Sequence, residues 1–125
     1  MSDILKLVQN DTLPTVYVSL IDQVTALPLD ISTATSISLA FRAIGATTLT
    51  DTLFGTKVAG LVNPDGSITS AGYTVAGTGG RCSFNWNGTT LATVGAFEGS
   101  VTVTFPGGVK QTVYETLRFQ IRASF

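Results

Sequence analysis

Five segments of this chain alternate apolar and polar side chains with a period of two. They span residues 14–20, 36–42, 82–86, 101–105 and 117–121. Successive side chains of a β-strand point to opposite faces, so this pattern predicts strands with one face toward a core. Five such segments in 125 residues predict antiparallel sheets. The apolar members, expected to point inward, are Val16, Val18, Leu20, Ile37, Leu39, Phe41, Cys82, Phe84, Trp86, Val101, Val103, Phe105, Leu117, Phe119 and Ile121.

Turn-forming residues separate these segments. Residues 106–108, Pro-Gly-Gly, predict a hairpin between 101–105 and 109–122, and residues 63–66, Asn-Pro-Asp-Gly, predict a second turn. Asn87-Gly88 fits either a two-residue hairpin turn or the approach to a short helical corner at 89–94. No stretch of ten residues has a convincing helical period. We therefore predict one domain, residues 1–125, with an all-β, immunoglobulin-like antiparallel β-sandwich of about seven to nine strands.

The residue types needed for common catalytic and metal sites are scarce. The chain has no histidine, and Cys82, its one cysteine, alternates with Phe84 and Trp86 as a core residue would. The acid pairs Asp22 with Asp30 and Glu98 with Glu115 are candidates for meeting across strands, but acids spread over the chain favour coincidence. For Asp11, Asp22 and Asp30, we expect turn bonding rather than Ca²⁺ ligation. We therefore expect no enzyme activity, no cofactor and no metal.

Charge is the unusual part of the composition. Charged residues make up 12% of the chain, against about 25% in typical domains. The net charge of −1 gives no strong field toward nucleic acid. No apolar run approaches the roughly 18 residues of a membrane helix, and the first residues lack the pattern of a secretory signal. A β-rich chain with few charges and many hydroxyls is typical of proteins whose surface neighbouring chains cover, although a Thr-rich soluble monomer also fits.

Two groups of residues are candidate partner contacts. Arg118 and Arg122 lie opposite the apolar set of their segment, and Lys110 belongs to the same hairpin. A basic stripe on an outward face would dock an acidic neighbour, but the same cations also fit a charged edge that prevents unwanted pairing. The second group lies in the N-terminal segment, residues 1–9, which is apolar and expected to reach out freely: Ile4, Leu5 and Lys6.

Several short motifs follow one another in an order that resembles a known family. The motifs lie at residues 7–14 (Leu-Val-Gln-Asn-Asp-Thr-Leu-Pro), 28–32, 37–42, 84–86, 95–99 and 101–108. Their order and spacing are similar to the N-terminal immunoglobulin-like domain of the phage upper-baseplate protein family and to related small virion structural proteins of tailed phages. Asn10 stands where glycine is usual, and both residues tolerate left-handed backbone. Phe97 occupies a position where tyrosine is common, so the hydroxyl of a tyrosine corner is missing.

The resemblance implies a non-enzymatic structural component of a tailed bacteriophage virion that docks on the tail, baseplate or neck. It implies other virion proteins as partners, multiple copies in a symmetric assembly, and location in the virion after assembly in the host cytoplasm. A capsid decoration protein on the phage head is an alternative. A free carbohydrate-binding or adhesion module is an alternative of another class, for which Tyr17, Tyr73 and Tyr114 are the available tyrosines.

Overall fold

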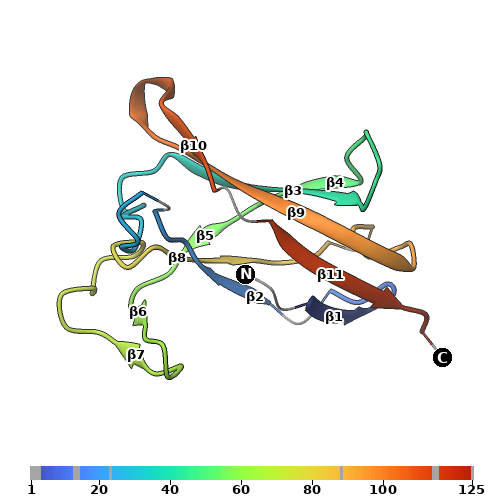
Figure 1. The fold of residues 1–125 in the computed structure, drawn as a ribbon, viewed down its shortest axis with the longest axis horizontal. Coiled ribbons are helices and arrows are strands. Elements are labelled where there is room, and N and C mark those ends of the chain that lie inside the picture. The colour runs from blue at the N-terminus through green and yellow to red at the C-terminus, as the bar shows by residue number, and fades with distance from the viewer. Residues whose placement is uncertain (1–3, 13–14, 23, 88, 114–115, 125) are drawn as a thin grey trace.

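A computed structural model describes residues 4–12, 15–22, 24–87, 89–113 and 116–124. These residues form an all-β sandwich (Figure 1), which confirms the predicted fold class. The strands are β1 (Ile4–Val8), β2 (Val16–Ser19), β3 (Ser36–Ala43), β4 (Asp51–Phe54), β5 (Thr56–Lys57), β6 (Leu61–Val62), β7 (Ile68–Thr69), β8 (Arg81–Phe84), β9 (Gly95–Thr104), β10 (Lys110–Thr112) and β11 (Leu117–Arg122).

The strands form two packed sheets and a separate hairpin. The larger sheet has six strands in the order β1-β11-β9-β3-β4, with β10 also paired to β9. The smaller sheet has the order β2-β8-β5, and β6 pairs with β7 in a hairpin that projects at the lower left of Figure 1. The predicted antiparallel pairing is correct except for β1, which pairs with β11 in parallel. A parallel pair needs a long connection. Here the connection along the chain from β1 to β11 includes all the other strands.

Gly55 is the point at which the chain passes from one sheet to the other. Strand β4 belongs to the larger sheet, and β5, which begins one residue after Gly55, belongs to the smaller one. A Cβ atom on Gly55 would lie 2.8 Å from Cε1 of Phe84 and 3.1 Å from the carbonyl oxygen of Ser83. Only a residue without a side chain therefore fits the crossing without displacing the core ring of Phe84.

The segment 109–122, predicted as one strand after the hairpin, is divided into β10 and β11. Thr112 and Leu117, five positions apart, pair with Thr102 and Gly99, which are three positions apart. The extra residues interrupt the ladder, although the turn itself, a 3-10 segment at Pro106–Gly108, is as predicted. This break and the crossing at Gly55 explain why the described residues form eleven strands rather than seven to nine.

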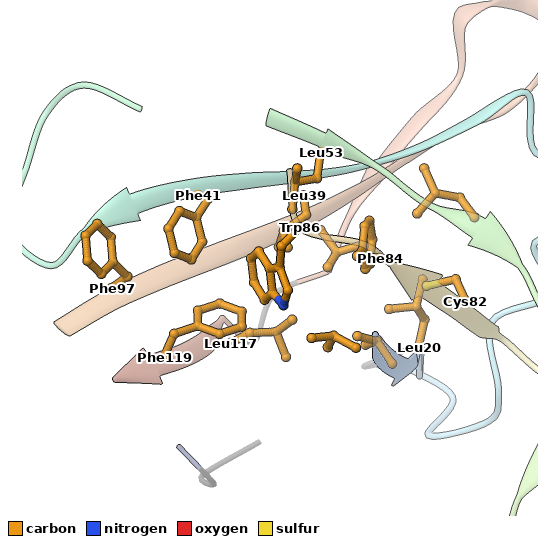
Figure 2. Close-up of a cluster of buried hydrophobic side chains, with 14 of the residues drawn as sticks. Leu20, Leu39, Phe41, Leu53, Cys82, Phe84, Trp86, Phe97, Leu117 and Phe119 are labelled. Atoms are coloured by element: carbon orange, nitrogen blue, oxygen red, sulfur yellow. The ribbon is translucent and has the colours of Figure 1, made fainter. Parts of the chain in front are cut away.

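The core lies between the two sheets and is centred on four aromatic rings (Figure 2). Phe41 stacks on Phe97 with ring centroids 4.9 Å apart and contacts Trp86 at 5.5 Å and Phe119 at 5.2 Å. Trp86 also meets Phe119 edge to face at 5.4 Å. The predicted inward residues are buried, with the exception of Phe105, which is only partly buried beside the core and lies between the end of β9 and the hairpin turn.

The loop 87–94 carries the chain from β8 in the smaller sheet to β9 in the larger one, so a two-residue hairpin at this place is wrong. Gly88 lies outside the described residues. Asp51 on β4 fixes the loop: its Oδ2 accepts hydrogen bonds from the buried Thr90 hydroxyl at 2.6 Å and from Asn87 Nδ2 at 2.8 Å. The backbone N–H of Thr52 donates to Asp51 Oδ1 at 2.8 Å. Asp51 therefore joins the sheet to the crossing loop.

Candidate docking face

The outer side of the six-stranded sheet carries a row of charged side chains that run across neighbouring strands. In the strand register, Arg118 on β11 lies directly opposite Glu98 on β9 and Ile4 on β1. Glu98 lies in turn directly opposite Arg42 on β3. Residues directly opposite each other on one face have Cβ atoms about 4.5–5.5 Å apart. Four side chains from four strands therefore lie side by side, in the order Arg42, Glu98, Arg118, Ile4.

More cations lie on the same side, because alternation and register give them the same orientation. Lys6 pairs with Gln120, Val8 with Arg122, and Lys110 with Thr104. We call this outer side the basic face and define it by five of the seven cations of the chain: Lys6, Arg42, Lys110, Arg118 and Arg122.

The two remaining cations, Lys57 and Arg81, make contacts with other residues of the domain away from the basic face. Lys57 Nζ donates to the carbonyl oxygens of Ser32 at 2.8 Å and Ala34 at 3.2 Å. The guanidinium of Arg81 lies 5.0 Å from the ring centroid of Tyr17 and donates to the carbonyl oxygen of Ala59. The positive charge that is presented to a neighbour is therefore gathered on one sheet face.

Of the predicted contact residues, Ile4, Lys6, Lys110, Arg118 and Arg122 lie on the basic face. Leu5 lies on the opposite, inward side of β1, and its role as a contact stays a prediction. It pairs with the inward-pointing Phe119, is partly buried and packs against the core. The expectation of a free N-terminal arm is wrong for its described part, since residues 4–8 form β1. Residues 1–3 lie outside the described residues.

The alternative interpretation, a charged edge, applies to only part of the basic face. Lys6 on β1 and Lys110 on β10 do lie on edge strands, where lysine discourages unwanted pairing. Arg118 and Arg122 lie on β11, between β1 and β9, and Arg42 lies on β3, between β9 and β4. The charged-edge interpretation is therefore wrong for Arg118 and Arg122, because β11 is paired on both sides. The three arginines project from the middle of the sheet, where edge protection does not explain them.

A shallow depression of about 310 Å³ lies within the basic face. It is lined by Ala40, Arg42, Leu49, Glu98, Gly99, Ser100 and Thr116. It lies next to the start of β11, since Thr116 directly precedes that strand and Gly99 pairs with its first residue, Leu117. Leu49 is 54% exposed and gives the depression an apolar side.

Arg42 and Glu98 form an ion pair inside this depression. Glu98 Oε2 accepts hydrogen bonds from Nε and Nη2 of Arg42, both at 3.2 Å. The Arg42 side chain is 45% exposed and that of Glu98 is 21% exposed. Exposed pairs of this kind are worth only about 0–1 kcal/mol, so the pair orients the guanidinium more than it stabilises the fold. Arg42 was not among the predicted contact residues, and Glu98 was considered only as an acid paired with Glu115. Each directly follows an inward phenylalanine, Phe41 or Phe97, so period two predicts it outward.

Two of the candidate carboxylates, Asp22 and Asp30, make hydrogen bonds within turns. Asp22 Oδ1 accepts from the N–H of Val24 at 2.8 Å and Asp30 Oδ1 from that of Ser32 at 2.9 Å, the turn bonding that we expected. Cys82 and Trp86 are buried, as predicted. Glu115, the other acid of the pair considered with Glu98, lies outside the described residues.

Within the described ranges, no group of three or more His, Cys, Asp or Glu side chains lies close enough together to hold a metal ion. The same ranges contain no helix of the length and hydropathy that a membrane crossing requires. No protein-family model, curated protein or solved structure matches this chain.

Proposed function

We propose that this chain is a non-enzymatic structural component of a tailed bacteriophage virion, docking on the tail, baseplate or neck through protein–protein contacts. The observation that carries the proposal is the basic face. A chain with only 12% charged residues gathers five of its seven cations on one sheet face, and three of them project from inner strands. Charge gathered on one face favours one orientation when the domain attaches to a complementary partner.

The strand order supports the finer proposal of an immunoglobulin-like fold. In variable-type immunoglobulin domains, strands G, F, C and C′ share one sheet, and strands B, E and D share the other. The two sheets here have the same neighbours. In the larger sheet, β11, β9, β3 and β4 take the places of G, F, C and C′, and in the smaller sheet, β2, β8 and β5 take the places of B, E and D. Two hallmarks differ: Cys82 is the sole cysteine, so no disulfide joins the sheets, and Trp86 follows β8 rather than lying on β3.

Two local features agree with the phage-domain resemblance. Asn10, at the position where glycine is usual in that family, has a left-handed backbone with φ of 67°. Phe97, at the position where tyrosine is common, lies near the start of β9 and stacks on Phe41 inside the core. Asn10 therefore has the left-handed backbone that glycine commonly adopts, whereas Phe97 packs in the core without the hydrogen bond that a tyrosine hydroxyl makes.

Quantitative mass spectrometry of phage particles tests the proposal. The particles are purified from a host culture that produces this chain. A small ring number, such as about 5, 6 or 12 copies per particle, supports a tail, baseplate or neck position. Hundreds of copies would support the alternative, a capsid decoration protein on the head. Absence of the chain from purified particles would refute both.

The structure gives little support to the carbohydrate-binding alternative. Such a module gathers exposed aromatic rings in one groove. Tyr17, 58% exposed, lies on β2 of the smaller sheet, and Phe54, 72% exposed, lies on β4 of the larger sheet. Tyr73 is half-buried, and Tyr114 lies outside the described residues. Binding of the purified chain to a glycan array would favour this alternative.

A further inference from the structure

We propose that the basic face binds an acidic segment of a partner protein, with one apolar side chain of that segment seated in the depression beside Arg42 and Glu98. This inference rests on the proposed function, because it names the chemistry of the partner to which the domain attaches. The proposed surface is formed by β1, β3, β9, β10 and β11 together, whereas the sequence suggested one hairpin and a free arm.

Charge complementarity is the first argument. The outward positions that define the basic face, taken with Glu98, carry a net charge of +4, since five cations are offset by one acid. The whole chain has a net charge of −1, so the positive charge is local and attracts a partner only when this face is presented. Carboxylates suit arginine in particular, because the planar guanidinium binds both carboxylate oxygens at once.

The spacing of the cations favours an extended segment. Lys6 pairs with Gln120, which is flanked along β11 by Arg118 and Arg122, so the three cations surround one neutral side chain. Residues two apart on a strand are separated by about 6.5–7 Å, which is also the spacing of alternate side chains in an extended peptide. A segment with acids at alternate positions therefore matches these cations without bending.

The depression supplies the second, apolar part of the interface. Ala40, Gly99 and Leu49 give it carbon-lined surfaces, and the 3.2 Å pair between Arg42 and Glu98 bounds it. An acidic residue on each side of one apolar residue would reach the surrounding cations while the apolar side chain enters the depression. This combination gives orientation, which charge alone does not.

A protein segment fits this face better than a nucleic acid does. Glu98 lies between Arg42 and Arg118 in the same row, so a phosphate backbone laid across the row would approach a carboxylate. The sequence pI of about 5.0 also gives no long-range attraction for nucleic acid. A peptide can set its acids against the arginines and a neutral residue against Glu98.

The test measures binding of the full chain to fluorescein-labelled peptides by fluorescence anisotropy at low ionic strength. The probe is a 13-residue peptide of alternating Glu and Thr with a central Leu, and its control has Gln in place of every Glu. We expect the Glu peptide to bind at least about tenfold more tightly than the Gln peptide, and added salt to weaken it. Equal binding of the two peptides would overturn the proposal, as would tighter binding of a 20-base-pair DNA duplex.

Matched variants locate the site. Lys6→Gln with Arg118→Gln lowers the net charge by two on the basic face, and Ser19→Glu with Thr74→Glu lowers it by two at exposed positions elsewhere. We expect the first pair to weaken binding at least tenfold and the second less than twofold, with unchanged circular dichroism and melting temperature for both. Equal weakening by the two pairs would mean that only net charge matters, and would overturn the proposed face.

A third variant and the particle assay separate the remaining claims. Ala40→Trp fills the depression and should reduce the affinity for the Leu peptide to that for a version with Gly at the centre. If the variant still binds the Leu peptide more tightly than the Gly peptide by the same factor as the unaltered chain, the apolar side chain does not bind in the depression. If Lys6→Gln with Arg118→Gln enters phage particles at the normal copy number, the docking proposal fails while the virion role stands. If the unaltered chain is missing from particles, the virion role itself fails.

Discussion

Removing the ring of Phe119 tests whether the aromatic cluster holds the two sheets together. Phe119 is 1% exposed and its ring contacts both Phe41, at 5.2 Å, and Trp86, at 5.4 Å. Burying a phenylalanine is worth about 1.5–3 kcal/mol in transfer free energy, and the cavity left by truncation raises the total to about 3–5 kcal/mol. Two lost ring contacts, worth about 0.5–1.5 kcal/mol each, put Phe119→Ala at the upper end of that range.

The assay is equilibrium unfolding in urea, with Phe54→Ala as the matched control. Phe54 loses the same atoms but is 72% exposed on β4, so its truncation should change the free energy of unfolding by no more than about 0.5 kcal/mol. For Phe119→Ala we expect the urea midpoint to fall with an unchanged slope, and the melting temperature to drop by about 10–20 °C. If both variants lose the same stability, the inward orientation of β11 and the cluster built on it are wrong.

Three further predictions concern the crossing, a carboxylate and the thiol. Gly55→Ala should lower the free energy of unfolding by about 1–3 kcal/mol, measured in urea, because its Cβ would lie 2.8 Å from a Phe84 ring atom. Hydrogen bonds, above all from the Thr90 hydroxyl, hold the pKa of Asp51 below its ordinary value. That stabilisation is full above the unfolded pKa of about 3.9 and is lost as pH falls through the folded pKa. The stability difference between the natural chain and Asp51→Ala should therefore be largest at pH 7 and shrink below about pH 4; a constant difference would contradict this. Burial raises the pKa of the Cys82 thiol to about 12, so a disulfide reagent at pH 8 should label it only when urea unfolds the chain, and fast labelling of the native protein would contradict its burial.

The sequence predicts the long strands well because their alternation is local information. In β3 and β11, every large apolar residue points inward and every polar residue points outward, and Ala40 is the one small apolar residue on the outer side. The two-residue strands β5, β6 and β7 are too short to show any period. Whether Gly55 marks a turn or a passage between sheets depends on the ring of Phe84, which lies 29 positions away in the sequence.

The basic face could be predicted only in part, for a related reason. Alternation gives the direction of Arg118 and Arg122, but it does not say which strands lie beside them. Residues 4–8 read Ile-Leu-Lys-Leu-Val, in which apolar residues occupy both faces and only Lys6 marks the outward one. The register that sets Ile4 beside Arg118 and Arg42 beside Glu98 is a property of the folded sheet. The depression likewise combines residues of β3, β9 and the position before β11, which only the folded sheet brings together.

The parallel pairing of β1 with β11 also sets the order in which the domain is completed on the ribosome. Ile4 pairs with Arg118, so β1 gains its partner only after more than a hundred further residues have been made. At about 5–20 residues per second, the first strand waits on the order of 5–20 s with its backbone groups unpaired. Contacts of such long sequence separation slow folding and leave apolar residues exposed meanwhile. Lys6, at the centre of β1, places a charge on this unpaired strand, and such a charge discourages pairing with another chain.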